Sequence, residues 1–260
     1  PNDDEPVRLP PEAMSAWILA PGKRTEGRLA KHGLVDEVRR LINATMMLDV
    51  SALDGPGIAS VADAAEAVSA LGERLTALPS LPGGPAEAGG DDARLLERSG
   101  ITGHSNPLSA PLHLWLDGDR VRGWAQYPQQ YEGPPGCVHG GFVAAAFDDL
   151  LGAAQTLSGT AGFTGTLTIR MVRPTPLHRR IDYEGGITRV EGRKIFTWGR
   201  ARQGDDVVAE AEGLFISPRA GLEDDRLARA KAAWPASSLG GVRPSLGGSA
   251  LASDPSALAD

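Results

Sequence analysis

Residues capable of chemistry are concentrated in one short stretch, where His139, Gly140 and Gly141 precede an apolar segment that contains two adjacent carboxylates. If a helix begins here, its first backbone amides have no partner within the helix and lie at its positive end. Because glycine has no side chain, a carbonyl oxygen could come within hydrogen-bonding reach of the Gly140 and Gly141 amides. Such donors stabilise the oxyanion that develops in acyl transfer. The alternative is a tight turn with a surface histidine, since His-Gly-Gly alone is a weak signal.

The two carboxylates, Asp148 and Asp149, stand in the middle of a segment that predicts a helix over residues 140–157. The segment has no polar face, which is typical of a buried helix, and its glycines and alanines are expected to let a sheet approach closely. An unpaired charge is costly in such a place, so the carboxylates are candidates for chemistry. Adjacent helical residues point about 100° apart. We therefore do not expect an acid–base pair, and we expect Asp149 to be an interface or rim charge.

The spacing along this helix predicts a site that two chains share. Gly141 and Asp148 are seven residues apart, which is about 10 Å along a helix axis. A general base must lie about 3 Å from the water that it activates. Two antiparallel copies of the helix around a two-fold axis would bring each Asp148 near the glycines of the other copy. We therefore expect a homodimer or a larger homo-oligomer.

Other catalytic patterns are weaker or missing. Cys137 and His139 could share one face of an extended segment and suggest a thiol nucleophile, but no third group is evident to orient the histidine. The histidines show no metal-ligand spacing; they are His32, His104, His113, His139 and His178. The sequence has neither a G-x-G-x-x-G dinucleotide fingerprint nor a G-x-S-x-G nucleophile elbow. It therefore predicts no metal site and no cofactor.

Composition bears on the class of protein. The 260 residues carry 26 basic and 33 acidic side chains, a net charge of −7, whereas a general nucleic-acid binder needs a basic surface. The single cysteine cannot form an internal disulfide, unlike the cysteines of small secreted proteins. No apolar run is long enough to span a membrane, and the acidic first residues do not resemble a signal peptide. We expect a cytoplasmic protein without a membrane span that does not bind nucleic acid.

Residues 94–217 have the pattern of an α+β domain. Alternating apolar residues predict six strands, two before the helix and four after it, at residues 112–116, 121–127, 166–172, 181–190, 194–202 and 207–216. Asp117-Gly118 is a turn between the first two strands. A single helix among antiparallel strands can be covered only if the sheet curls around it. The expected fold is a curled antiparallel sheet around one buried central helix.

The remaining parts of the chain are helical or low in complexity. Apolar spacing of three and four predicts two helices in the N-terminal extension, residues 1–93, which ends in a Gly/Pro-rich linker. We expect these helices to pack against the main domain; the alternative is a substrate lid. Residues 218–260 are a tail rich in Ala, Ser, Gly and Pro, with at most a short helix.

Several motifs together resemble those of the hotdog-fold acyl-CoA thioesterases, in the phenylacetyl-CoA-type and mitochondrial long-chain branches. The central motif is YEGPPGCVHGG at residues 131–141, with Asp148 nine residues after His139. Further matches are SNPL at 105–108, TGTLTIRMVRPTPL at 164–177 and EGRK at 191–194. The resemblance covers residues 100–217 and implies the hotdog fold, an α+β class.

The resemblance also implies roles for individual residues. It assigns the oxyanion end to His139, Gly140 and Gly141, the role of general base or nucleophile to Asp148, and the positioning of water to Thr164. It places groups that contact coenzyme A at Arg170, Arg193 and Lys194. The sequence departs from the family at two positions. Gly133 stands where many relatives carry Asn, and Val172 stands at a position that is often basic.

The expected function is hydrolysis of an acyl thioester by water, with acyl-CoA as the favoured substrate. An acyl-carrier-protein thioesterase and another hotdog enzyme such as a hydratase are alternatives with related chemistry. A non-catalytic protein that binds acyl thioesters is an alternative of a different class, and the presence of both Asp148 and Thr164 favours catalysis over it.

Overall fold

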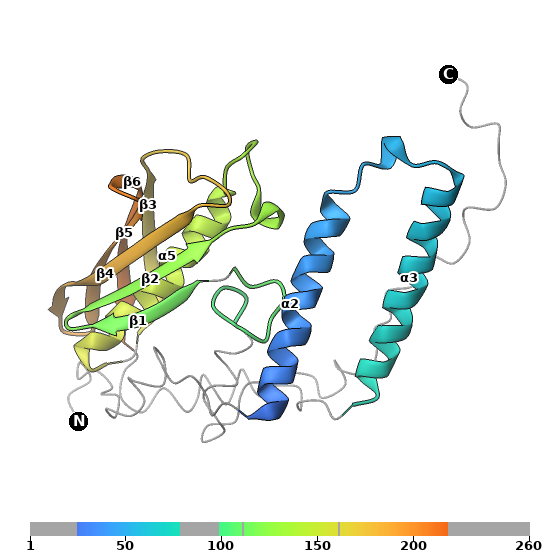
Figure 1. Ribbon diagram of the computed structural model, residues 1–260. Coiled ribbons are helices and arrows are strands. Elements are labelled where there is room, and N and C mark those ends of the chain that lie inside the picture. Colours follow the sequence, from blue (N-terminus) through green and yellow to red (C-terminus); the bar gives the residue numbers. More distant parts are fainter. Residues whose placement is uncertain (1–24, 79–98, 111, 161, 218–260) are drawn as a thin grey trace.

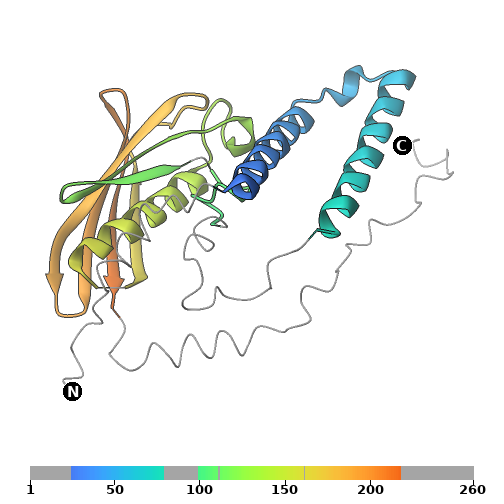
Figure 2. The ribbon, with the colours of Figure 1, turned by 60° about the horizontal axis from the view of Figure 1, so that its bottom comes forward.

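The computed structural model describes residues 25–78, 99–110, 112–160 and 162–217. They form two parts, a pair of N-terminal helices and an α+β domain with a strongly curved sheet (Figures 1 and 2). The linker at residues 79–93 and the tail at 218–260, for which we expected a flexible segment and at most a short helix, lie outside the described residues.

One antiparallel sheet of six strands forms the domain, in the order β1-β2-β4-β5-β6-β3. The strands are β1 (His113–Asp117), β2 (Arg120–Gln126), β3 (Phe163–Met171), β4 (Arg180–Glu191), β5 (Lys194–Gln203) and β6 (Asp206–Ile216). All six predicted strands are therefore confirmed. Side chains of β2, β5 and β6 alternate between buried and more exposed positions, which is why their sequence pattern could be read.

Helix α5 (Gly140–Gln155) crosses the concave face of the sheet and continues into the 3-10 turn η3 (Thr156–Ser158) (Figure 2). It buries Phe147, Leu150 and Leu151 completely, and each such side chain stabilises the fold by about 1.5–3 kcal/mol. A curled antiparallel sheet wrapped around one central helix is the hotdog fold, so the expected α+β class is confirmed.

The glycines that allow this close packing belong to the sheet. A Cβ added at Gly199 would lie 3.0 Å from the ring of Phe147, and one added at Gly185 would lie 3.3 Å from Leu150. Gly152, in the helix, has open space around it. The prediction that the glycines of the helix admit the sheet was wrong, although the small side chains Ala146, Ala153 and Ala154 of α5 are buried.

The two N-terminal helices are α2 (Glu26–Met46) and α3 (Gly55–Thr76), joined through the 3-10 turn η1 (Val50–Ala52). Asp54 caps α3 by accepting a hydrogen bond from the Gly57 amide at 2.8 Å, and Pro56 follows in the first turn, an arrangement that favours helix initiation.

Only α2 lies against the domain, in the part of the chain that the structure describes (Figure 1). Its buried residue is Val35, whereas α3 buries no residue. Ile58 of α3 is 60% exposed, and Val61 and Val68 on the same helix are also exposed. The expectation that both helices pack against the main domain was therefore wrong for α3. An amphipathic pattern indicates that a face suits burial, but it does not indicate which surface covers that face.

Candidate active site

The N-terminus of α5 presents one backbone amide without a protein partner. His139 is the N-cap residue, and its Nδ1 accepts a hydrogen bond from the Gly141 amide at 3.0 Å. Its carbonyl oxygen accepts from the Phe142 amide at 2.9 Å. Within the described residues the Gly140 amide has no hydrogen-bond partner. Of the two glycine amides assigned to the oxyanion end, only that of Gly140 is free to bind a ligand oxygen.

The same cap orients the imidazole ring of His139. A ring nitrogen that accepts a hydrogen bond carries no proton, so the neutral ring holds its proton on Nε2. The ring lies edge-on to that of Phe142, with 6.3 Å between centroids, and the residue is exposed. The exposed His139 therefore offers an Nε2–H donor, and the free amide of Gly140 belongs to the next residue in the chain.

The loop before the helix holds His139 through its backbone. The His139 amide donates to the Tyr131 carbonyl at 2.8 Å, and the Gly133 amide donates to the Cys137 carbonyl at 2.9 Å. A Cβ added at Gly133 would lie 2.7 Å from the Cα of His139. A side chain at position 133 would therefore displace His139 in this structure.

The alternative of a thiol nucleophile gains no support from this geometry. Cys137 is a half-buried free cysteine, and in the described part of the chain its thiol makes no hydrogen bond to His139, whose Nδ1 is taken by the Gly141 amide. A thiol nucleophile needs a base within hydrogen-bonding reach.

Asp148 lies exposed on one flank of α5, where it faces strand β3. Its Oδ1 accepts a hydrogen bond from the Thr164 hydroxyl at 2.9 Å, so the structure brings these two predicted residues together. In a single chain Gly140, Gly141 and Asp148 are exposed, so α5 is buried toward the sheet and open on this flank.

A β-bulge directs Thr164 toward this carboxylate. Thr164 pairs with Phe215 and Thr166 pairs with Leu214, so Gly165 is an extra residue in β3. Facing residues of paired strands point to the same side of a sheet, and Phe215 is buried on the side of α5. Without the bulge, Thr164 would share the outer face with Thr166.

Asp149, on the other flank of α5, is held inside its own chain. It accepts hydrogen bonds from the hydroxyls of Thr102 at 3.1 Å and Ser99 at 3.4 Å. Burial raises the pKa of its carboxyl to about 6; the charge of Asp148 also raises this pKa, whereas the bonds from Thr102 and Ser99 lower it. The expectation of an interface or rim charge was therefore wrong, because residues 99–102 cover this flank.

The three basic residues assigned to coenzyme A do not meet in one chain. Arg170 is ion-paired with Glu210, which also accepts from Arg200 at 3.2 Å. These bonds, with that from Arg170 as the largest cause, lower the pKa of the Glu210 carboxyl. Arg193 and Lys194 lie at the turn between β4 and β5. Lys194 precedes Arg200 on β5 by six residues, or about 20 Å along the strand.

Tyr131 is a supporting residue that the sequence analysis did not single out. It appeared there only as the first residue of the motif at residues 131–141. The signal in the sequence that could have indicated this role was a large aromatic residue eight positions before the N-cap of the central helix.

The described ranges contain no group of three or more His, Cys, Asp or Glu side chains that could hold a metal ion. Within the same ranges, no helix has the length and apolar character needed to cross a membrane.

Comparison with known proteins places these features in context. No family model matches the chain. Over 87 residues, or 33% of this chain, the sequence is 37% identical to acyl-coenzyme A thioesterase THEM4 of Xenopus laevis, covering 39% of that protein. It is 30% identical over 87 residues to acyl-coenzyme A thioesterase THEM5 of Homo sapiens, covering 35% of it. The matches thus span little more than a third of these curated relatives.

One crystal structure is similar over a larger share of both chains. It is of a thioesterase superfamily protein with 31% sequence identity, and the match covers 72% of this chain and 94% of that chain, with a TM-score of 0.62. That coverage extends beyond the residues of the hotdog domain alone. With a six-stranded sheet curled around one helix and an Asp–Thr pair on the flank of that helix, the chain belongs to the thioesterase superfamily.

Proposed function

We propose that this protein is an enzyme that hydrolyses acyl thioesters, with acyl-coenzyme A as its substrate. The observation that carries the proposal is the exposed Asp148 carboxylate, held by the Thr164 hydroxyl at 2.9 Å. Because this carboxylate is exposed in a single chain, it is accessible to a second molecule. The similar proteins named acyl-coenzyme A thioesterases support the choice of substrate.

In the proposed reaction, Asp148 takes a proton from water while the water oxygen attacks the thioester carbonyl carbon. The tetrahedral intermediate carries its negative charge on the former carbonyl oxygen, which binds the Gly140 amide and the Nε2–H of His139. Collapse breaks the carbon–sulfur bond, and the leaving thiolate takes up the proton from Asp148. The products are a carboxylic acid and a free thiol, and the enzyme returns to its starting state.

Direct attack by Asp148 is the second route to the same products. It would form a mixed anhydride that water then hydrolyses. Incorporation of ¹⁸O into Asp148 during a single turnover in labelled water would identify this route. Attack of the labelled water on the carboxyl carbon of Asp148 would leave the label in the protein, whereas general-base catalysis places it only in the released acid.

We also propose that each active site is built from two chains. Gly140 and Asp148 lie on one helix with more than 10 Å between them along its axis, so a single chain cannot apply both to one carbonyl. Strand β3 is an edge of the sheet, and its residues are mostly exposed. An exposed edge strand offers unpaired backbone groups to a second copy. A two-fold axis there would place Asp148 of one chain near Gly140 of the other.

The proposed function is tested by measuring thiol release from purified protein with acyl-CoA thioesters of several chain lengths, beside the matching acyl-carrier-protein conjugates. Faster release from acyl-CoA supports the proposal. Faster release from the carrier-protein conjugates would change the substrate, and binding without thiol release would make the protein non-catalytic.

The shared site is tested by mixing two inactive variants, Asp148→Asn and Gly140→Val. An added Cβ at Gly140 would meet only the end of the Met171 side chain, at 3.6 Å, so the valine is expected to be compatible with folding. Random exchange makes half of the dimers mixed, and each mixed dimer has one intact site of two. About a quarter of the wild-type activity should return. Chains that demonstrably exchange without restoring activity would place the whole site in one chain.

A further inference from the structure

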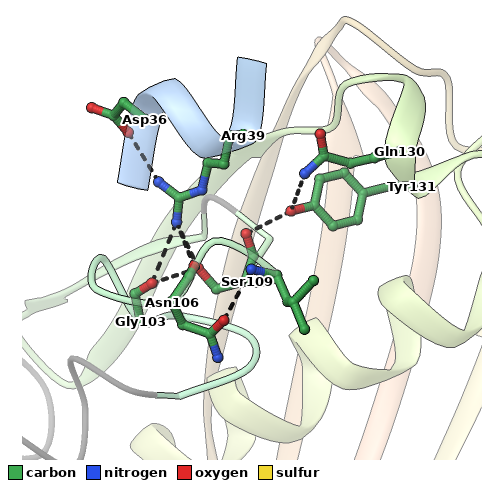
Figure 3. A network of polar contacts seen from close by, with 8 residues as sticks. Asp36, Arg39, Gly103, Asn106, Ser109, Gln130 and Tyr131 are labelled. Carbon is green, nitrogen blue, oxygen red and sulfur yellow. Dashed lines mark hydrogen bonds and ion pairs between the residues drawn. The ribbon is translucent and has the colours of Figure 1, made fainter. Parts of the chain in front are cut away.

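The guanidinium group of Arg39 joins helix α2 to the domain by several hydrogen bonds (Figure 3). The side chain of Arg39 is only 19% exposed. Its Nη2 donates to the hydroxyl of Ser109 at 2.8 Å and to the carbonyl oxygens of Asn106 at 2.9 Å and Gly103 at 3.4 Å. Its Nη1 pairs with Asp36 of the same helix at 3.1 Å. Arg39 thus holds three acceptors of one loop, residues 103–109.

Neighbouring imidazole rings, tilted against one another, make a second contact between α2 and the domain. The ring of His32 on α2 lies 5.7 Å from that of His104, which lies 5.1 Å from that of His113 on β1. The hydrogen bonds of Arg39 and the ring contact of His32 therefore both reach the loop at residues 103–109. Helix α2 also lies directly against the 3-10 turn η2 (Gln129–Tyr131), which contains Tyr131.

Tyr131 holds this loop from the opposite side. Its hydroxyl donates to the Ser109 carbonyl at 2.6 Å, as Figure 3 shows, and the residue is fully buried. Its own carbonyl accepts the His139 amide at 2.8 Å. Its ring also meets the ring of Phe142 edge-on, with 4.8 Å between centroids. One residue thus joins the loop clamped by Arg39 to the N-cap and first turn of α5.

We infer that Arg39 is a positioning residue for the N-terminus of α5. By clamping residues 103–109 against Tyr131, it holds His139 and the Gly140 amide in the direction in which they meet a thioester carbonyl. The inference rests on the proposed function, because it assigns the oxyanion role to that end of the helix. Helix α2 then belongs to the catalytic apparatus through a positioning role.

The expected kinetic signature follows from what the oxyanion donors do. They bind the oxyanion of the transition state more strongly than the carbonyl of the bound substrate, so loosening them lowers kcat and leaves KM nearly unchanged. A displacement of 1 Å can cost about 10²-fold in rate. Removing Arg39 would displace the oxyanion donors only indirectly, through the loop and Tyr131. We therefore expect a smaller loss in kcat, of about tenfold.

The test compares Arg39→Met with Arg40→Met in the full chain. Arg40 is a matched control, because it is the next residue of α2 and makes the same kind of bond to an acidic residue three positions earlier, Glu37 at 2.6 Å, but its side chain is 75% exposed. Arg39→Lys is the conservative variant, which keeps the charge and part of the donors. For each variant, kcat, KM and the hydrogen-exchange rate of the His139 amide are measured.

The inference expects Arg39→Met to lower kcat about tenfold and to speed exchange at His139. Arg40→Met should match the wild type, and Arg39→Lys should fall between the two. A kcat within twofold of that of Arg40→Met, or unchanged exchange at His139, would overturn it. If Arg39→Met does not fold, Tyr131→Phe takes its place, since it removes only the hydroxyl that holds Ser109.

Failure of the proposed function is distinguishable from failure of this inference. If the wild-type protein hydrolyses no thioester, the proposed function is wrong. The hydrogen-exchange rate of the His139 amide then decides by itself whether Arg39 holds the N-terminus of α5. Faster exchange in Arg39→Met than in Arg40→Met then still supports the clamp, and equal rates overturn it.

Discussion

The two flanks of helix α5 carry neighbouring carboxylates in opposite environments. On the flank toward β3, Asp148 is exposed and accepts one hydrogen bond, from Thr164. On the flank covered by residues 99–102, Asp149 accepts bonds from Ser99 and Thr102, and burial raises its pKa to about 6. The comparison shows that residue type and position in the sequence do not set the role of a carboxylate. The covered flank uses its aspartate to hold a loop, and the open flank leaves its aspartate accessible to a second molecule.

The largest expected effect is on catalysis at the open flank. Asp148→Asn keeps the shape of the side chain but removes the proton acceptor, so kcat for thioester hydrolysis should fall by about 10²–10⁴-fold. Asp149→Asn is the matched control and should keep kcat within a few-fold of the wild type. Steady-state kinetics on both variants, after circular dichroism has shown that they are folded, gives the answer. The assignment would be reversed if the Asp149 variant lost activity and the Asp148 variant kept it.

The second prediction concerns stability at the covered flank. Asp149→Asn removes a charge that is costly to bury while leaving an oxygen that can accept from Thr102. The rise of the Asp149 pKa from 3.8 to about 6 corresponds to a gain of about 1–3 kcal/mol in the free energy of unfolding of the variant at pH 7, at 1.36 kcal/mol per unit. Denaturant unfolding measures it. A variant less stable than the wild type at pH 7 would contradict the prediction.

This gain should depend on pH with a definite sign. A carboxyl whose pKa is raised in the folded state binds its proton more tightly there than in the unfolded chain. Its contribution to stability is therefore fully present below pH 3.8 and is lost as pH rises through about 6. The wild type and Asp149→Asn should accordingly differ little near pH 4 and most above pH 6. A difference that is constant across this range would show that the carboxyl is not the cause.

The third prediction, with a smaller expected effect, concerns the β-bulge that places Thr164 and Thr166 of β3 on opposite faces of the sheet. Thr164→Val keeps the branched shape but removes the hydroxyl bonded to Asp148, and a bond to a charged group is worth about 1.5–3 kcal/mol. We expect kcat to fall about tenfold, at 1.4 kcal/mol for each factor of ten. Thr166→Val, on the outer face of the same strand, should leave kcat unchanged. Equal effects of the two substitutions would mean that Thr164 acts only as a strand residue.

The smallest expected effect concerns binding of the coenzyme A part of the proposed substrate. We keep Arg193 and Lys194 as the proposed phosphate contacts and leave out Arg170, because Glu210 already pairs with it. Neutralising both residues should raise KM for acyl-CoA several-fold and leave kcat nearly unchanged, as expected for lost uniform binding. Arg122→Gln, a substitution of a distant arginine paired with Asp117, controls for net charge. An unchanged KM would separate these two residues from substrate binding.

Much of the fold could be predicted because apolar residues alternate along the strands but form a continuous run along the central helix. Six strands were placed from alternation, and the helix was placed from its continuous apolar run, ending in the structure at Gln155 with a 3-10 turn through Ser158. The pairing of Asp148 with Thr164 came from a resemblance to a family. No property of the two residues alone indicates that they meet.

What could not be predicted depends on contacts between distant segments. The bulge at Gly165 reverses the faces of β3, and a glycine in a strand is only a general sign of such an irregularity. Coverage of Asp149 depends on Ser99 and Thr102, about fifty residues earlier in the chain. The clamp formed by Arg39 depends on a loop more than sixty residues away, and the arginine looks no different in sequence from its neighbour Arg40.

The glycines beneath α5 have a consequence for the acyl chains that this protein could accept. At Gly185 and Gly199 the helix rests on the sheet with no spare layer, since even one added carbon would crowd Leu150 or Phe147. A hydrocarbon tail is as thick as the side chains that already fill this space. Such a tail therefore cannot thread beneath the middle of the helix. For the thioester hydrolysis that we propose, we expect selectivity for chain length to be set along the open flank, where a longer tail costs the protein no repacking of its core.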